Sequence, residues 1–182
     1  MPKIEGVKLR KQRKAYTCGP ASLRIIFYYY GHRVSEQELV DFAEIDENGT
    51  SEYQMRQLAH KYKFSFYGHA NGHLKDVSKY IEKGIPILIC YQDYGKIDGN
   101  SGHYAVLTSV DKDWVEIADP ANHNGTPIAH SKRMMKNNFL YRWFEDEIYN
   151  DGTKQRIKRW YAIIRPKNLR KSKVSKNISK KG

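Results

Sequence analysis

The spacing of apolar residues predicts four helices in the first half of the chain. The clearest covers residues 18–30, where Leu23, Ile26 and Phe27 recur at helical spacing and Gly31 follows as a stop signal. Apolar positions with the same period predict the other three, the first of which begins with the capping-box spacing of Ser35 and Glu38. They cover residues 35–43, 50–62 and 74–81.

The second half of the chain carries short, β-rich apolar runs bounded by turn residues. They predict a buried strand over residues 85–91, a hairpin of 103–110 with 114–119, and a last strand over 158–165. Residues 131–139 are predicted to form one more helix. Because helices come first and strands later, we expect one α+β domain over residues 1–165.

The formal net charge of +12 is concentrated at the two ends of the chain. Residues 1–14 carry six Lys or Arg against one acid, and residues 165–182 carry eight and no acid. The 150 residues between them hold 18 basic and 19 acidic side chains. We therefore expect a nearly neutral folded body and a basic, disordered tail over 166–182. Such ends attract polyanions weakly, so nucleic-acid binding through the tail is one hypothesis.

Several other classes of protein are disfavoured. The longest apolar stretches are too short to span a bilayer, and the N-terminus lacks the apolar run of a secretory signal. Two cysteines do not make a disulfide framework. A cytoplasmic protein is expected, with no metal or organic cofactor implied and its oligomeric state open.

The two cysteines occupy contrasting environments. Cys18 begins the first predicted helix, where the macrodipole and free N–H groups favour the thiolate, which is the nucleophilic form. Cys90 lies within a run of apolar residues, where a thiol is usually a small core residue. Cys18 is therefore the candidate nucleophile, although its position alone fits a buried residue equally well.

A thiolate nucleophile needs an imidazole partner and a group that orients it. Of seven histidines, His103 is the candidate, because it opens a strand after the Gly-rich segment 98–102. His103 and Asp119 lie equally far from Asp111 in the hairpin turn, so the register predicts them directly opposed, roughly 5 Å apart. A slip of one residue would put them on opposite faces. The face they share should be buried, and it also carries Ala105, Leu107, Val115 and Ile117.

Gln12 lies six residues before Cys18. Acyl transfer needs hydrogen-bond donors aimed at the developing oxyanion. The Gln12 side-chain amide and the Cys18 backbone N–H can supply two such donors. Alone, a Gln in a basic stretch is an ordinary surface residue.

Three sequence blocks resemble one family. Residues 12–23, QRKAYTCGPASL, resemble the cysteine block of the bacteriocin-processing (double-glycine-leader) family of papain-like cysteine peptidases. Residues 102–107, GHYAVL, and 117–120, IADP, are similar to its His and Asp blocks. The resemblance spans roughly residues 7–165. Many family members are N-terminal domains of ABC exporters, whereas here no membrane segment follows, so a stand-alone domain is expected.

The resemblance implies a papain-like α+β fold, in which the helix that carries Cys18 packs on an antiparallel sheet that carries His103 and Asp119. It also implies roles for the site residues: Cys18 is the nucleophile, His103 the base and Asp119 its orienter. Gln12 lies in the oxyanion hole.

The leading hypothesis is a cysteine peptidase that hydrolyses peptide or protein substrates. A thiol acyl transferase of the transglutaminase kind uses Cys, His and Asp in the same chain order and stays an alternative. A catalytically retired peptide-binding module is a third, disfavoured because Cys18, His103, Asp119 and Gln12 are all present.

Overall fold

The computed structural model describes residues 3–93, 102–121, 131–148 and 151–168. The tail predicted over 166–182 lies mostly outside this range, so the boundary at residue 165 and the disorder of the tail stay predictions. No helix among the described residues is both long and apolar enough to cross a membrane.

Four helices form where the apolar spacing predicts them. Serine side chains cap two of them, because Ser35 and Ser51 each accept a hydrogen bond from the backbone N–H three residues later. Each of those N3 residues returns a side-chain bond, which completes a capping box. The four helices are α1 (Cys18–Tyr29), α2 (Glu36–Ala43), α3 (Glu52–Lys61) and α4 (Leu74–Glu82).

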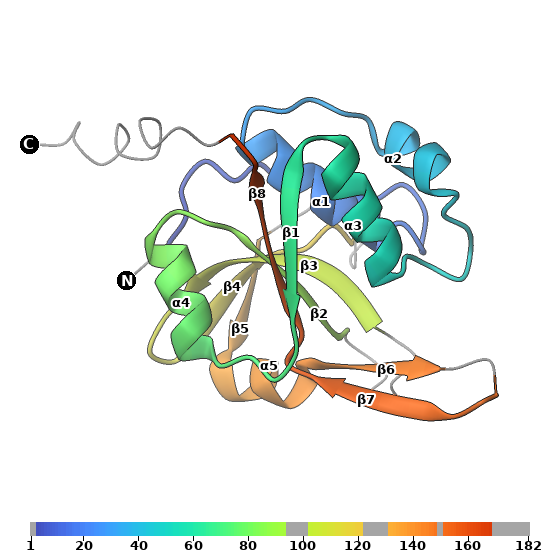
Figure 1. The fold of residues 1–182 in the computed structure, drawn as a ribbon. Helices are drawn as coiled ribbons and strands as arrows, with labels where there is room; N and C mark the ends of the chain where they lie inside the picture. The colour runs from blue at the N-terminus through green and yellow to red at the C-terminus, as the bar shows by residue number, and fades with distance from the viewer. Residues whose placement is uncertain (1–2, 94–101, 122–130, 149–150, 169–182) are drawn as a thin grey trace, which may run out of the picture.

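A six-stranded antiparallel sheet forms the centre of the molecule (Figure 1). Its spatial order is β1-β8-β2-β3-β4-β5, and a separate hairpin pairs β6 with β7. The strands are β1 (Phe64–His69), β2 (Ile87–Gln92), β3 (Gly102–Val110), β4 (Trp114–Ala118), β5 (Ser131–Met135), β6 (Phe144–Ile148), β7 (Lys154–Lys158) and β8 (Tyr161–Pro166). A fifth helix, α5 (Lys136–Arg142), connects β5 to β6.

Helices cover both faces of the sheet, and each face has its own core. Helices α1 to α3 lie over one face, whose core contains Phe27, Leu58 and Val106. Helices α4 and α5 lie over the other, whose core contains Val77 and Phe139. The β6–β7 hairpin extends beyond the sheet at the lower right of Figure 1. The α+β class expected from the sequence is confirmed.

The helix predicted over residues 131–139 is wrong in its first half. Residues 131–135 form edge strand β5, which pairs antiparallel with β4 and buries Met134 against the sheet. Pairing with an available sheet edge overrides the local helical pattern. The last predicted strand also begins late, at Tyr161, because Arg159 adopts a positive φ of 53° between β7 and β8.

The predicted hairpin of β3 and β4 forms, but its register differs from the predicted one. Near the turn Val110 pairs with Val115, whereas beyond an irregularity between Leu107 and Ser109 the pairing shifts by one residue. Val106 then pairs with Ala118, so Asp119 is not directly opposite His103. The predicted face is nevertheless correct: Ala105, Leu107, Val115 and Ile117 share one buried core.

Candidate active site

Cys18 is the first residue of α1, and a buried carboxylate fixes the loop that leads to it. Glu36, only 2% exposed, accepts hydrogen bonds from the Thr17 hydroxyl (2.7 Å) and the Arg13 backbone N–H (2.8 Å). Thr17 makes no side-chain cap, which leaves the N-terminal N–H groups of α1 without one. An anion at Cys18 would therefore meet the positive end of the helix dipole.

His103 and Asp119 meet through a short hydrogen bond. The imidazole Nε2 lies 2.7 Å from Asp119 Oδ1, and both side chains are buried. This contact leaves Nδ1 for a second partner, and the Cys18 thiol lies close enough to the ring to help raise the pKa of His103. The structure thus brings Cys18, His103 and Asp119 together in the order that the sequence predicts.

A second set of groups holds the other oxygen of Asp119. The Tyr91 hydroxyl donates to Asp119 Oδ2 at 2.9 Å, and Lys132 Nζ lies 3.6 Å from the same oxygen. Lys132 also donates to the Tyr91 hydroxyl (3.1 Å) and to Asp93 (3.1 Å). The Ala121 backbone N–H bonds Asp119 Oδ1 at 2.9 Å, so both carboxylate oxygens are held in place.

These contacts set the charges of the pair. Burial disfavours a charged imidazole, but hydrogen bonds to Asp119 and Cys18 outweigh it and raise the pKa of His103 to about 10. Burial also opposes ionisation of Asp119, yet His103, the Ala121 N–H and Lys132 hold the pKa of that carboxyl well below its usual range. At neutral pH His103 is therefore a cation beside an anionic Asp119.

Gln12 lies beside this group, but its amide is engaged elsewhere. Its backbone N–H donates to the carbonyl of Pro120, which follows Asp119 (2.9 Å). Its side-chain Nε2 donates to the carbonyls of Lys14 (2.9 Å) and Ala15 (3.0 Å). Gln12 could donate to an oxyanion only if its Nε2 released or shared one of these two bonds. Oε1 is buried with no hydrogen-bond partner among the described residues.

Cys90 is buried on β2, at 1% exposure, as its apolar run predicts. Burial, with Glu145 and Cys18 nearby, raises the pKa of the Cys90 thiol well above its usual value. It therefore stays a neutral thiol and is unsuited to nucleophilic attack. Neither cysteine forms a disulfide.

Tyr91, Lys132 and Glu145 are site neighbours that the sequence does not reveal. Tyr91 lies in a continuous apolar run, where its hydroxyl gives no separate signal. Lys132 and Glu145 come from late segments whose strands had not been predicted. The described residues contain no group of three or more His, Cys, Asp or Glu side chains placed to hold a metal ion.

Comparisons with known proteins show the family of the chain. Residues 6–143 match the Peptidase C39 family. An uncharacterized protein of Methanothermobacter marburgensis is 32% identical over 111 residues, which cover 61% of this chain and 70% of the relative. A second, from Methanothermobacter thermautotrophicus, is 31% identical over 110 residues, covering 60% and 69%.

Solved structures of similar fold are also peptidase domains. The peptidase domain of Streptococcus ComA, a bi-functional ABC transporter, superposes with a TM-score of 0.66 at 21% identity, covering 88% of this chain and 98% of that one. A double glycine motif protease in complex with a leader peptide superposes with a TM-score of 0.61 at 16% identity, covering 91% of this chain and 99% of that one. A putative C39-like peptidase from Bacillus anthracis superposes with a TM-score of 0.66 at 15% identity, covering 90% of this chain and 96% of that one. The chain belongs to the Peptidase C39 family and has its papain-like fold.

Proposed function

We propose that this protein is a cysteine peptidase whose nucleophile is Cys18. The observation that carries the proposal is the Cys18–His103–Asp119 arrangement, with His103 between a thiol and a carboxylate. A thiol beside an imidazole that is hydrogen-bonded to a carboxylate is the arrangement expected of an activated thiol. Family membership supports the same reaction class. The peptide substrate is proposed by analogy with the leader peptide bound to one structural neighbour.

In the proposed reaction, cationic His103 already holds the proton, and the ionised Cys18 sulfur attacks a peptide carbonyl carbon. A C–S bond forms, the oxyanion lies at the N-terminus of α1, and the Cys18 backbone N–H donates to it. His103 then protonates the leaving amine as the C–N bond breaks. Water attacks the resulting thioester, giving a proton to His103, and the C–S bond breaks to release the acid.

Asp119 keeps His103 oriented and cationic in this scheme, and Gln12 is proposed as the second oxyanion donor. Gln12 would act once substrate draws its Nε2 away from the Lys14 and Ala15 carbonyls. Replacing it by Glu removes the donor but keeps its shape. The Gln12→Glu variant should therefore lose catalytic efficiency while Cys18 keeps its reactivity toward a small alkylating agent.

Alkylation by iodoacetamide at neutral pH tests the activated thiol. Cys18 should label faster than free cysteine, while Cys90 should stay unlabelled because it is buried and neutral. Labelling of Cys18 no faster than free cysteine would exclude the activated nucleophile and favour a retired peptide-binding module. Cys18→Ala serves as the control for adduct assignment by peptide mass spectrometry.

Product analysis separates hydrolysis from acyl transfer. A peptide library is incubated with the enzyme in the presence of an added primary amine. Free acids as the main products support the peptidase. Amides of the added amine as the main products would instead indicate a thiol acyl transferase.

A further inference from the structure

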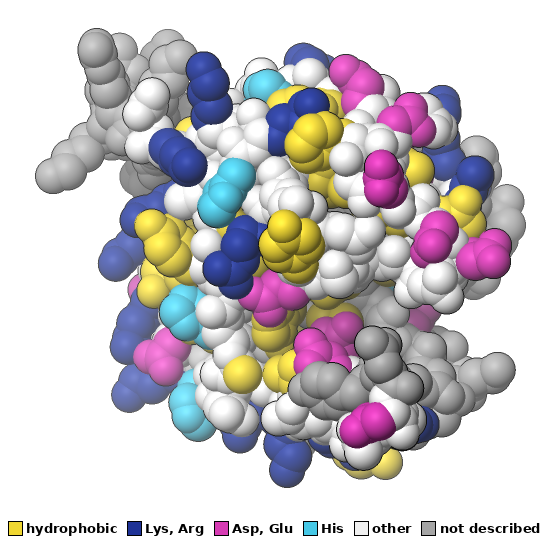
Figure 2. Space-filling view, turned by 45° about the vertical axis from the view of Figure 1, so that its right-hand side comes forward, with side chains coloured by type: hydrophobic (Ala, Val, Ile, Leu, Met, Phe, Trp, Pro, Cys, Tyr) yellow, Lys and Arg dark blue, Asp and Glu magenta, His cyan; other side chains and the backbone are white. Residues whose placement is uncertain are grey.

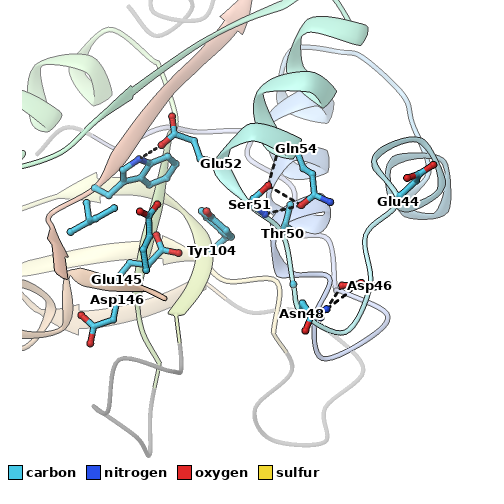
Figure 3. Close-up of a pocket in the computed structure, with 14 residues that line it drawn as sticks. Glu44, Asp46, Asn48, Thr50, Ser51, Glu52, Gln54, Tyr104, Glu145 and Asp146 are labelled. Carbon is cyan, nitrogen blue, oxygen red and sulfur yellow. Dashed lines mark hydrogen bonds between the residues drawn. The ribbon is translucent and has the colours of Figure 1, made fainter. Parts of the chain in front are cut away.

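A pocket of about 520 Å³ opens between the loop before α3 and the β6–β7 hairpin (Figure 3). Its size lies within the range of roughly 300–1,000 Å³ common for ligand pockets. Figure 2 shows acidic side chains above and below a hollow on the right of the view. Its walls include the rings of Tyr104 and Trp160, whose centroids lie 5.7 Å apart.

The pocket borders the proposed nucleophile and base. Thr50, in its wall, packs so tightly on Gly19 that a Cβ there would lie 2.8 Å from the threonine side chain. Gly19 directly follows Cys18. On the other side, a Cβ on Gly102, the residue before His103, would lie 3.8 Å from Glu145 Cγ. The pocket therefore lies beside the two segments that carry Cys18 and His103.

The β6–β7 hairpin is tied to the sheet at this place. Gln92, fully buried at the end of β2, donates its side-chain amide to the Phe144 carbonyl (3.2 Å). This bond fixes the start of β6 and with it Glu145, the next residue. Glu145 consequently has a defined position at the inner side of the pocket, beside the Cys90 thiol.

The described part of the lining is acidic. None of the described residues that line the pocket is Lys, Arg or His, and six are acids: Glu44, Asp46, Glu52, Glu145, Asp146 and Glu147. Two of these carboxylates have arginine partners from outside the lining: Glu52 pairs with Arg56 (2.7 Å) and Asp146 with Arg156 (2.8 Å).

Glu145 differs, since it has no Lys or Arg partner among the described residues. Burial, with Glu147 and Glu52 nearby, raises the pKa of Glu145 and outweighs the lowering effect of the neighbouring Cys90 thiol. A partly buried carboxylate without a counter-ion is stabilised by any cation that enters.

A further feature favours an organic cation. Aromatic faces such as those of Tyr104 and Trp160 attract guanidinium and ammonium groups. The carboxylates do not converge as a metal site within the described chain.

We propose that this pocket receives a Lys or Arg side chain of the peptide that reacts at Cys18, with Glu145 as its counter-ion. The inference deepens the proposed peptidase function and rests on it for the peptide nature of the ligand. Glu145 is a specificity-determining residue here, and Glu52 and Glu147 add to the negative potential around it.

Peptidyl chloromethyl ketones test the pocket without requiring turnover. Tripeptide reagents carry Arg at each of the three positions in turn, and matched reagents carry citrulline, which has the same shape without the charge. The rate of Cys18 alkylation is followed by intact mass. At one position the Arg reagent should react about 10-fold faster than its citrulline match, because the desolvated ion pair is lost with the charge. A ratio within about twofold of one at all three positions would overturn the proposal.

Glu145→Gln should reduce that ratio to below about 3, while Glu82→Gln, an exposed carboxylate on α4, should leave it unchanged. Equal iodoacetamide rates in the three proteins show that Cys18 is intact. A ratio that persists in Glu145→Gln contradicts the assigned counter-ion. Should that variant not fold, salt titration of the wild type decides, because raising NaCl from 50 mM to 1 M must lower the ratio.

Hydrolysis of fluorogenic peptides of the same sequences is measured in parallel. Charge discrimination without hydrolysis would support the pocket and contradict the peptidase. Hydrolysis without charge discrimination would support the peptidase and contradict the pocket. The two proposals can therefore be tested independently.

Discussion

Asp119 is a buried carboxylate and Glu145 a partly buried one, and their surroundings give them opposite properties. Asp119 has a cation on each side, His103 at 2.7 Å and Lys132 at 3.6 Å, and its pKa is lowered. Glu145 has other carboxylates and a neutral thiol beside it, and its pKa is raised.

The difference shows that burial alone does not decide what a carboxylate does. Asp119 is a fixed charge, because its counter-ions belong to the protein and are always present. Glu145 has no Lys or Arg partner among the residues that the structure describes, so a cation from a ligand would stabilise its charge. One carboxylate thus organises the proposed catalytic groups, and the other is suited to recognise a ligand.

Replacing Asp119 by Asn should have the largest effect. The amide keeps the shape but removes the anion that orients His103, and kcat/KM should fall on the order of 10²–10⁴-fold. The pKa of His103 should fall below about 10, because the hydrogen bond and charge of Asp119 no longer raise it while burial still lowers it. Peptide hydrolysis and NMR titration of the imidazole measure the two effects.

The Asp119–His103 pair should also make the free energy of unfolding depend on pH. The stabilisation from Asp119 is present above pH 3.8 and is lost as pH falls through its lower folded pKa. That from His103 is fully present below pH 6.5 and is lost as pH rises through about 10. The stability deficit of Asp119→Asn should therefore be largest between pH 3.8 and 6.5 and shrink toward pH 10. Asp76→Asn, at a surface ion pair, is the matched control, and an unshifted His103 titration in Asp119→Asn would contradict the assignment.

Replacing Tyr91 by Phe should have a smaller effect on activity. It removes one hydrogen bond to the ionised Asp119 and leaves the ring packing, so kcat/KM should fall about 5- to 20-fold. Tyr29→Phe is the control, because its hydroxyl also donates a hydrogen bond, to the Gly84 carbonyl (2.8 Å), far from the site along the fold. Equal losses of activity in the two variants would show that Tyr91 contributes only to folding.

The local parts of the site were predictable from the sequence. The helix that starts at Cys18 follows from its apolar spacing, and the serine caps of α2 and α3 follow from their capping boxes. The shared face of His103 and Asp119 was predicted from equal distances to the turn. That prediction is correct only because of an irregularity that the sequence does not reveal. The register near the turn would place His103 and Asp119 on opposite faces of the sheet. The shift between Leu107 and Ser109 returns them to the same face.

The parts contributed by late, weakly patterned segments were not predictable. Lys132 reaches Asp119 from a strand that pairs only because the edge of β4 is available. Glu145 reaches the pocket because Gln92 anchors the hairpin that carries it. The orientation of the Gln12 amide depends on two backbone carbonyls whose direction no periodicity encodes. Each of these depends on tertiary contacts between segments distant in the sequence.

The smallest effect should come from Glu145→Gln on stability, and its sign should be opposite to that of Asp119→Asn. Because the folded pKa of Glu145 lies above 4.5, ionising it costs the folded state stability as pH rises. The amide avoids this cost, so the variant should be more stable than wild type at pH 8, by no more than about 1 kcal/mol given its partial exposure.

Chemical denaturation at pH 4 and pH 8 measures that difference, which should disappear at pH 4 because the wild-type carboxyl is then protonated in the folded state. Glu82→Gln is again the control, since its side chain is exposed and should show no such dependence. A Glu145→Gln variant less stable than wild type at pH 8 would mean that Glu145 already has a stabilising partner. Glu145 would then have a counter-ion within the protein, as Asp119 does. The pocket would offer no unpaired carboxylate to the cationic side chain of a ligand.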